Sequence, residues 1–293
     1  MSRPESVSIR FHEDPGLFRE AVNFTAAETS FSPRLIEKDY FCTVLLSYLM
    51  TADAALVFKG GTCLAKVHAE FYRLSEDLDF VIPMPADASR SQRSAQMPGL
   101  KKAVHSLERR LPIFRVTQAM TGSNSSKQYI ASAQYTSLLS RQDDTIKIEV
   151  ALREPLLTPA VDGPARTLLL DPVSGRPMLK PVVLRCISRM EAFAEKFRAA
   201  LSRREAAIRD FYDLDHAVRK LGLQPHEAQL VALVKQKLAV PGNEPADMAE
   251  PRLAALRRQL EPHLKPVLRD SDFAEFDLDR AFQIASEMAA QVI

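Results

Sequence analysis

Two aspartates near residue 80 carry the strongest chemical signal in the chain. The run Asp77-Leu78-Asp79-Phe80-Val81 alternates polar and apolar residues, so in a strand Asp77 and Asp79 point to one face. Adjacent carboxylates repel each other unless a cation compensates. Mg²⁺ is commonly held by one or two carboxylates together with substrate phosphates. The pair therefore predicts a metal site, although such a pair alone is also common on solvated strand edges.

A glycine turn precedes these aspartates. Gly60, Gly61 and Thr62 follow the apolar residues Val57 and Phe58, and the chain has only nine glycines. Glycine lets the backbone approach a phosphate closely, and N–H groups that open a helix bind anions. A glycine pair alone is usually a simple turn, but together with the aspartates it indicates a phosphate-binding site beside a metal.

A third carboxylate lies further along the chain. Residues 145–152 read as a strand, in which Ile146 and Ile148 face one side and Lys147 and Glu149 the other. A lone glutamate on a strand usually faces solvent. Glu149 would complete a three-carboxylate cluster if this strand lies beside the aspartate strand, and the sequence leaves that adjacency open.

Several basic residues allow two interpretations each. Lys66 either reaches a phosphate held by the turn or is simply exposed. Arg73 either pairs with a carboxylate or positions a phosphate. Lys38 lies within an apolar helix, where it is either solvated or paired, or else faces the nucleotide.

Residues 188–220 form a second informative stretch. Lys196, Arg203 and Asp210 are spaced seven apart, so on one continuous helix they would lie along nearly one line. Between residues 180 and 220, ten Lys and Arg residues face six Asp and Glu residues. Taken alone, this stretch would be a salt-bridged helix surface.

The remaining elements follow from periodicity and turn signals. Ser32 and Pro33 predict the start of a helix. We expect helices at 12–30, 64–71 and 100–111, a loop at 83–99, strands at 56–58, 113–119, 129–138 and 145–152, a proline-rich connector at 153–181 with a short strand near Leu168, and helices from there to the end.

Composition excludes little. The 293 residues are 46% hydrophobic and 26% charged, with net charge +2 and a pI near 8.4, so nothing demands nucleic acid. Cys42, Cys63 and Cys186 lack metal-ligand spacing, and we expect reduced buried thiols. The N-terminus lacks the apolar core of a signal peptide, and no apolar run approaches the roughly 20 residues of a membrane span. We therefore expect a cytoplasmic protein, without membrane association.

The order of these motifs resembles the AbiEii/AbiGii-type nucleotidyltransferase toxins, within the DNA polymerase beta-like nucleotidyltransferase superfamily. The resemblance spans about residues 30–220 and is carried by EKDYF at 37–41, FKGGTCLAK at 58–66, RLSEDLDF at 73–80, IKIEV at 146–150 and AEKFRAALSRREAAIRDFYDLD at 194–215. The superfamily more often has Gly-Ser at the turn, and Thr62 retains the hydroxyl. No motif covers the helices of residues 221–293.

The resemblance implies a two-lobed α/β (α+β) protein. Residues 1–180 would form a nucleotidyltransferase lobe with a mixed sheet, and residues 181–293 a helical lobe that contributes nucleotide or acceptor contacts. The implied reaction transfers a nucleotide from an NTP to an acceptor and releases pyrophosphate. Family members are toxins of toxin–antitoxin or phage-defence systems, and some add nucleotides to tRNA 3′ ends.

The resemblance also implies roles for single residues. Asp77, Asp79 and Glu149 would bind Mg²⁺, or Mn²⁺ in its place, and act in catalysis, with Glu149 helping to deprotonate the acceptor. Lys196 would neutralise phosphate charge, and Asp210 would position Lys196 or the nucleotide. The residues expected to bind the nucleotide are Lys59, Gly60, Gly61, Thr62, Lys66, Arg73, Ser75, Lys196 and Asp210.

Three functions are compatible with these features. The first is a metal-dependent nucleotidyltransferase toxin that acts on RNA, with tRNA as the expected acceptor. The second is a nucleotidyltransferase with a small-molecule or protein acceptor, and the third a non-catalytic NTP-binding module. Three retained carboxylates favour catalysis over binding alone. We expect a monomer and a cognate antitoxin, whose mode of action the sequence does not reveal.

Overall fold

The computed structural model describes residues 10–53 and 55–293, which divide into two compact units. The first runs to Pro155 and includes Ala160–Cys186, and the second comprises Leu156–Pro159 and Ile187–Ile293. The last strand of the first unit ends at residue 186, beyond the boundary expected at 180. The expectation about a signal peptide rests largely on residues 1–9, which lie outside the described residues. No helix in the described ranges has the length and apolar character needed to span a membrane.

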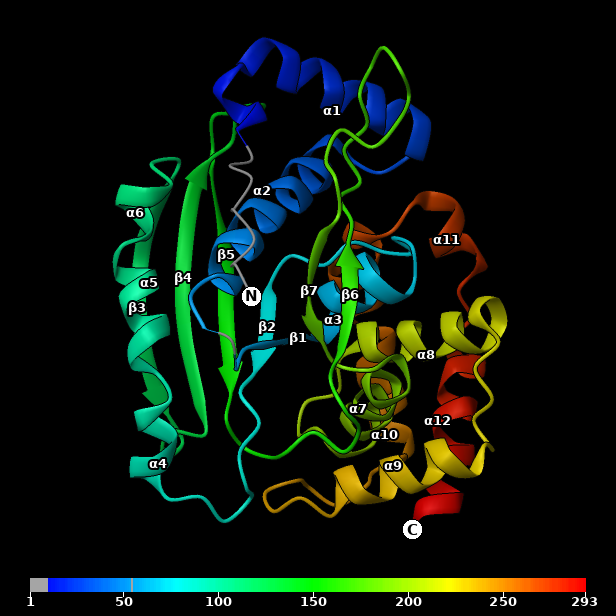
Figure 1. Cartoon of the computed structure of the whole chain (residues 1–293). Helices are drawn as coiled ribbons and strands as arrows, with labels where there is room; N and C mark the ends of the chain where they lie inside the picture. Colours follow the sequence, from blue (N-terminus) through cyan, green and yellow to red (C-terminus); the bar gives the residue numbers. More distant parts are fainter. Residues whose placement is uncertain (1–9, 54) are drawn as a thin grey trace. The chain divides into compact units, whose positions relative to one another are not determined.

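A seven-stranded mixed sheet forms the centre of the first unit (Figure 1). Its order is β3-β4-β5-β2-β1-β7-β6. The strands are β1 Val57–Lys59, β2 Leu78–Val81, β3 Phe114–Ser123, β4 Gln128–Thr136, β5 Asp143–Ala151, β6 Val161–Ala165 and β7 Val182–Cys186. The pairs β2–β5 and β1–β7 are parallel, and the other neighbours are antiparallel. The mixed α/β fold and the three long strands predicted from alternation are confirmed.

Alternation along β5 fixes which of its faces is buried. Ile146, Ile148 and Val150 have no exposed surface, whereas Lys147 and Glu149 are part-exposed. In β2, Leu78 and Phe80 are buried in the same way and Asp79 is part-exposed. Burial of each apolar side chain stabilises the fold by about 1.5–3 kcal/mol. Burial of these apolar faces therefore sets the register of β2 and β5 and places their polar side chains on the same, opposite face of the sheet.

Helices surround this sheet within the first unit. They are α1 Pro15–Thr29, α2 Pro33–Met50, α3 Gly60–Cys63, α4 Arg90–Ala95, α5 Pro98–His105 and α6 Leu107–Arg110, with the 3₁₀ turn η1 Phe11–Glu13 and the π-helical turn η2 Leu64–His68. As predicted, α2 begins after Ser32. Its Phe41 ring packs on Tyr135 of β4, with ring centroids 4.2 Å apart, and thereby ties α2 to the sheet. The expected loop at 83–99 contains α4, whose Ser89–Gln92 capping box starts a helix in a polar segment.

The second unit is helical, as expected. Its elements are α7 Arg189–Ser202, α8 Ile208–Leu221, α9 Ala228–Leu238, α10 Glu250–Arg257, α11 Asp270–Glu275 and α12 Leu278–Val292, with the short turns η3 Leu260–Leu264 and η4 Lys265–Val267. A buried ion pair joins α9 to α7, because Lys237 Nζ lies 2.7 Å from Glu191 Oε1.

The expectation of one continuous helix through residues 196–210 is wrong. The helix α7 ends at Ser202, the next residue Arg203 has an extended ψ of 135°, and α8 starts at Ile208. The reversal lets α7 and α8 pack together and bury Phe197 and Phe211 completely. Lys196 and Asp210 therefore meet across two helices rather than along one.

Candidate functional site

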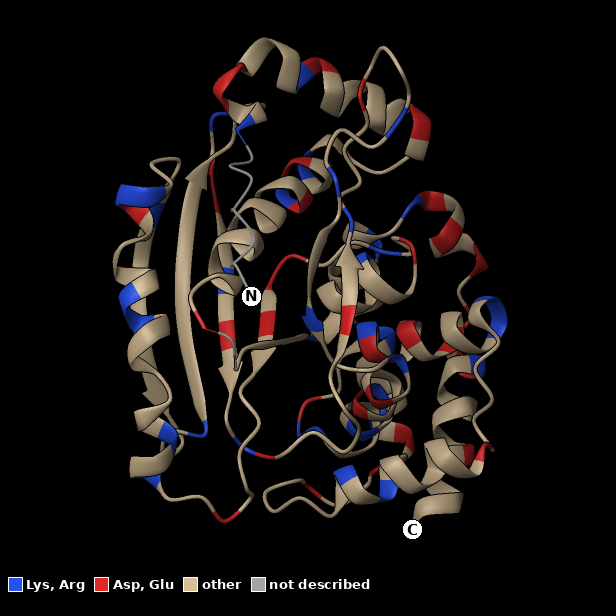
Figure 2. Ribbon diagram, viewed as in Figure 1, with Lys and Arg blue, Asp and Glu red and all other residues tan. Residues whose placement is uncertain are grey.

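Asp79 and Glu149 lie side by side on neighbouring strands. In the parallel pair of β2 and β5, Asp79 is the register partner of Glu149, and Leu78 is the partner of Ile148. Register partners present their side chains on the same face of a sheet. Figure 2 shows acidic residues on both strands at this level. The adjacency that the sequence left open is therefore present.

Asp77 stands just before β2 and is tied to the glycine turn. The Thr62 hydroxyl donates a hydrogen bond to the Asp77 carbonyl, and Thr62 is almost fully buried. In this arrangement the hydroxyl orients the residue that carries a carboxylate. The group of Thr62 that remains for a phosphate is its backbone N–H.

The carboxyl groups of the cluster differ in proton affinity. Burial raises the pKa of Asp77, and the charges of Lys38 and Lys147 only partly oppose this rise. Burial also acts to raise the pKa of Glu149, but hydrogen bonds from Lys147 and Gln128 hold it below its ordinary value. The pKa values of the two acids are thus shifted in opposite directions. A bound cation would stabilise the ionised form of Asp77 most, because burial disfavours that form.

Lys147 is a member of the cluster that the sequence analysis did not single out. Its Nζ lies 2.7 Å from Glu149 Oε2, and Gln128 Nε2 donates to Glu149 Oε1 at 2.6 Å. Burial lowers the pKa of Lys147, but Glu149, Asp77 and Asp79 outweigh it and raise the pKa. The signal was present in the alternation of β5, which puts Lys147 on the same face as Glu149.

The glycine turn packs directly against the acidic strand. Gly60 has a φ of +75°, and a Cβ atom there would lie 2.8 Å from Asp79 Cβ. A Cβ atom at Gly61 would lie 2.6 Å from an Arg73 nitrogen and 3.1 Å from Ser75 Oγ. Only glycine fits at Gly60, where the backbone is left-handed and the added Cβ would overlap Asp79, whereas at Gly61 the end of the Arg73 side chain would have to move. The helical segment opens at Gly60 itself, not at Leu64 as expected.

Lys66 does not lie where a phosphate contact requires it. Its Nζ is 2.6 Å from Asp39 Oδ1 and 2.7 Å from Thr43 Oγ1, and the residue is 1% exposed. Asp39 also accepts hydrogen bonds from Thr167 and the Leu168 N–H. The ammonium is fully used in joining α2 to the segment after β6, and we do not assign Lys66 to the nucleotide.

Lys38 belongs to an ion-pair network beside Asp77. Its Nζ lies 2.9 Å from Asp144 Oδ1 and 3.3 Å from Glu76 Oε1. Arg34 contacts the same two carboxylates, at 3.0 Å and 2.9 Å. Lys38 is therefore paired rather than solvated. The charge of Lys38 also lowers the pKa of Asp77, against the effect of burial.

The other residues expected at the nucleotide surround the turn. Lys59 is the register partner of Asp79 across β1 and β2. Arg73 is almost fully buried, donates to the Leu74 carbonyl and lies over the Tyr72 ring. With Ser75, these residues border Gly60 and Gly61, so six of the expected residues, Thr62 included, gather at one end of β1.

Lys196 and Asp210 form an ion pair within the second unit. Lys196 Nζ lies 2.8 Å from both Asp210 Oδ1 and Asp213 Oδ2, and Arg203 contacts Asp210 Oδ2 at 2.9 Å. Burial would raise the pKa of Asp210, but Lys196 and Arg203 hold it below its ordinary value. The contact of Asp210 with Lys196 is the one that a positioning role would require, and Asp213 shares it.

The three carboxylates fit a hard divalent cation. They supply only oxygen donors, as Mg²⁺ and Mn²⁺ prefer, and two of them are register partners. Although Lys38, Lys59 and Lys147 place positive charge near these carboxylates, burial still raises the pKa of Asp77. The donor set is therefore compatible with the expected metal, which would compete with Lys147 for Glu149.

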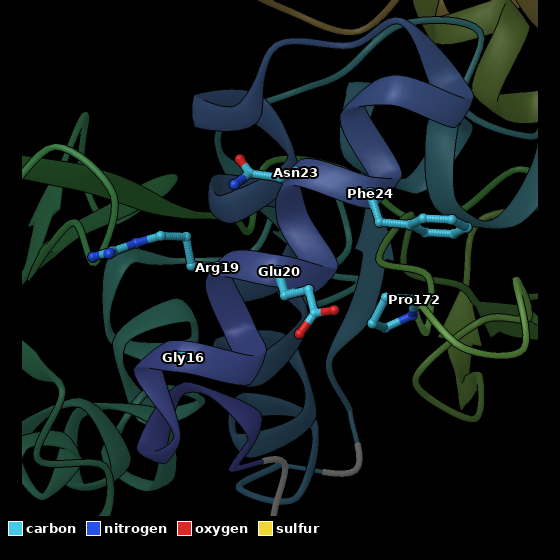
Figure 3. A pocket seen from close by; sticks show the side chains of 6 residues that line it. All are labelled: Gly16, Arg19, Glu20, Asn23, Phe24 and Pro172. Carbon is cyan, nitrogen blue, oxygen red and sulfur yellow. The ribbon is translucent and has the colours of Figure 1, made fainter.

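Two hollows lie apart from the carboxylate cluster. One, of about 560 Å³, is lined by Gly16, Arg19, Glu20, Asn23, Phe24 and Pro172 (Figure 3). The other, of about 520 Å³, lies in the second unit between residues 203–204 and 244–252. Neither contains a carboxylate of the cluster, so neither changes the assignment of the site.

Residues 45–286 match the family model described as nucleotidyl transferase AbiEii toxin, type IV TA system. No curated protein matches the chain. Among solved structures, the MenT4 nucleotidyltransferase toxin of Mycobacterium tuberculosis is similar, with 19% identity over 94% of this chain and 99% of that one and a TM-score of 0.49. JHP933 of Helicobacter pylori has 16% identity over 93% of this chain and 91% of its own, with a TM-score of 0.46.

Proposed function

The chain belongs to the AbiEii family of nucleotidyltransferase toxins of type IV toxin–antitoxin systems, and we propose that it transfers a nucleotide from an NTP to the 3′ end of an RNA, with Mg²⁺ as cofactor and tRNA as the acceptor. The observation that carries the metal-dependent part is the pairing of Asp79 with Glu149 beside Asp77. The acceptor rests on the resemblance of the sequence and on charge.

Asp77, Asp79 and Glu149 would hold the cation in this proposal. When bound, Mg²⁺ or Mn²⁺ would supply positive charge that neutralises the triphosphate. Glu149 is ionised at neutral pH, as an ordinary glutamate is, and it would accept the proton of the acceptor hydroxyl; Lys147 and Gln128 hold the carboxylate in place. The backbone of Asp77 and Asp79 is fixed by β2 and by the Thr62 hydrogen bond, so their carboxylates are oriented before substrate arrives.

The glycine turn binds the triphosphate. The backbone N–H groups of Gly61 and Thr62, which open α3, would donate to the phosphates. The missing side chains of Gly60 and Gly61 make room for Asp79, Arg73 and Ser75 around the turn. Lys59 and Arg73, which border the turn, supply positive charge, and Ser75 a hydroxyl. This arrangement supports a phosphate directly beside Asp79.

Lys196 neutralises phosphate charge in the proposed reaction. This role follows from its sequence motif, and the ion pairs with Asp210 and Asp213 support it by fixing the ammonium. A lysine held by two carboxylates loses little conformational entropy when it meets a phosphate. Asp210 acts through Lys196 and is a positioning residue.

An RNA acceptor is supported by local charge. The segment of residues 180–220 has four more basic than acidic residues, although the whole chain has a net charge of only +2. A polyanion would be attracted to such a segment in a salt-dependent way. We also propose that a cognate antitoxin accompanies the protein, as the type IV description of the family implies.

A labelling assay tests the proposal. The purified chain is incubated with total tRNA, Mg²⁺ and each α-labelled NTP in turn, beside Asp77→Ala, Lys196→Ala and the control Asp143→Asn at the exposed start of β5. We expect label on tRNA with the native chain and the control, and none with the other variants or with chelator.

Other outcomes of this assay redirect the proposal. Label on protein or on a small molecule, but not on tRNA, would replace the RNA acceptor. Unchanged transfer by purified Asp77→Ala protein would remove the metal assignment. If no label is transferred with any of the four NTPs, the non-catalytic NTP-binding module would be the remaining candidate function.

A further inference from the structure

The structure brings together two cysteines and a histidine that lie far apart in the sequence. Cys63 ends α3, His68 ends η2 and Cys186 ends β7. One ligand atom from each of the three lies within 4.8 Å of the other two. All three residues belong to the first unit. We propose that Cys63, His68 and Cys186 form a binding site for a thiophilic transition-metal ion of the Zn²⁺ type.

The donor set selects the class of ion. Two thiolates and an imidazole are ligands of Zn²⁺ and similar borderline or soft ions, whereas Mg²⁺ requires oxygen. In a tetrahedral zinc site with bonds of about 2.3 Å to sulfur, the two sulfur atoms stand about 3.8 Å apart. The observed spacing needs only a small side-chain adjustment to reach this geometry.

The local backbone explains why His68 can join Cys63. Residues five apart on an α-helix point about 140° away from each other. The turn at 64–68 is instead π-helical, with hydrogen bonds five residues apart, so positions 63 and 68 lie on one side. Such turns are frequent at functional sites. The spacing of Cys63 and His68 in the sequence matches no zinc-binding motif, so the sequence did not indicate this local geometry.

The third ligand is brought in by the sheet. Cys186 is the register partner of Phe58 on β1, the strand that leads into the glycine turn. Neighbouring Gly163 on β6 leaves room there, since a Cβ atom at this position would lie 3.0 Å from Cys186 Sγ. Both cysteines are fully buried and His68 is part-exposed, which leaves the histidine side as the approach for an ion.

The three side chains already contact one another, because Cys63 and His68 hydrogen-bond to Cys186. The Cys186 thiol also donates to the Val161 carbonyl at 3.5 Å, and metal binding would release this proton. Cys42 is equally buried. Cys42 lies on α2 and is not part of the cluster, so it provides a matched buried thiol for control experiments.

An ion at this site would restrain the glycine turn. Cys63 directly follows Thr62, whose hydroxyl holds the Asp77 carbonyl. The metal–ligand bonds would link the segment of residues 60–68 to β7 and so restrain this short helical segment. Binding at this site is thus separate from the carboxylate cluster but structurally connected to it.

Cobalt provides a direct test with the full chain. Metal-free reduced protein is titrated with Co²⁺, with absorbance as the readout. We expect one Co²⁺ per chain with sulfur-to-metal charge-transfer and tetrahedral ligand-field bands, displaced by one equivalent of Zn²⁺ but not by a large excess of Mg²⁺. Cys63→Ser and Cys186→Ser should lose the charge-transfer intensity, His68→Gln should bind at least about ten-fold more weakly, and Cys42→Ser should behave as the native chain.

The outcomes that overturn the proposal do not depend on transferase activity. They are absence of charge-transfer bands in folded native protein, their survival in Cys63→Ser or Cys186→Ser, or their loss in Cys42→Ser. A Cys63–Cys186 disulfide in protein that binds no Co²⁺, detected by mass spectrometry without reductant, would also overturn it. If the serine variants do not fold, X-ray absorption of the Zn²⁺-loaded native chain decides, because a shell without sulfur contradicts the site.

Discussion

Asp79 and Glu149 are 70 positions apart in the sequence but are register partners on the parallel strands β2 and β5. Their adjacency turns two ordinary strand carboxylates into one acidic site, with Asp77 one step before the strand. Lys147 lies on the Glu149 side and compensates part of the charge. Gly60 closes the site from β1, since its missing side chain makes room for the Asp79 carboxylate.

The first prediction concerns this pair. Asp79→Asn and Glu149→Gln keep the side-chain shape but remove the charge that holds the cation. We expect each to lower the rate of nucleotide transfer by at least about 100-fold, because metal-based stabilisation of the transition state is worth several kcal/mol. Initial rates with labelled NTP measure this, and Asp143→Asn on the same strand serves as control. Equal losses in the control would show that the effect is not specific to the cluster.

The second prediction separates crowding from backbone strain at Gly60. Gly60 and Gly175 both have positive φ, of +75° and +68°, but only Gly60 has atoms within 4 Å of an added Cβ. Alanine at either position costs about 1–2 kcal/mol from the left-handed backbone. We expect only Gly60→Ala to lose transfer, because its methyl group would displace the Asp79 carboxylate. Urea unfolding and transfer rates of both variants check this, and an active Gly60→Ala enzyme would contradict it.

These two cases show what the sequence could predict. Alternation identified the polar faces of β2 and β5, and the glycine pair identified the turn, because both signals are local. The order of strands depends on long-range pairing, which no local pattern encodes, so the position of Glu149 beside Asp79 remained conditional. The roles of Lys196 and Asp210 came from the resemblance of motifs. Periodicity alone would have assigned both residues to a solvent-exposed helix surface.

Burial of Cys42, Cys63 and Cys186 as free thiols is confirmed. The tertiary arrangements that the sequence did not reveal have the same origin as the position of Glu149. Lys66 was expected at the phosphate, yet Asp39 on α2 and Thr167 after β6 converge on the same buried network through tertiary packing. The break between α7 and α8 contains neither proline nor glycine, so no turn residue announced it. Cys63 and Cys186 are separated by more than a hundred residues, and only the pairing of β1 with β7 brings them together.

The third prediction follows from the burial of Lys66. Lys66→Met leaves the Asp39 carboxylate, which is 3% exposed, without its cation, and loss of one partner of a buried pair costs about 3–5 kcal/mol. We expect a large fall in the free energy of unfolding but an unchanged KM for NTP. Lys59→Met, beside Asp79, should show the reverse pattern. A raised KM in Lys66→Met at a temperature where it is folded would restore Lys66 to the nucleotide site.

The fourth prediction uses pH to test the role of Asp210. Its pKa in the folded state lies below the ordinary 3.8 because of Lys196 and Arg203. The carboxylate therefore stabilises the fold above pH 3.8, and this contribution disappears as the pH falls through the lower folded pKa.

Asp210→Asn should have a free energy of unfolding about 3 kcal/mol below that of the native chain at pH 7. This difference, the stability gap, should become smaller in acid. Urea unfolding from about pH 7 to about pH 2 measures the gap. Asp247→Asn is the control, since Asp247 is exposed and lies 3.9 Å from Arg252. A gap that does not change with pH would mean that the Asp210 charge is not what stabilises the fold.

The fifth prediction concerns competition between Lys147 and the metal. The ammonium contacts Glu149 at 2.7 Å, so a divalent ion must bind against its charge and displace it from the carboxylate. We expect Lys147→Met to bind Mn²⁺ more tightly in the absence of NTP, by up to about five-fold, which corresponds to the roughly 1 kcal/mol of a part-exposed ion pair. Electron paramagnetic resonance of free Mn²⁺ measures the affinity, with exposed Lys102→Met on α5 as control. Weaker Mn²⁺ binding in Lys147→Met would instead mean that the lysine orients Glu149 for the metal, because the carboxylate would lose its anchor along with the competing charge.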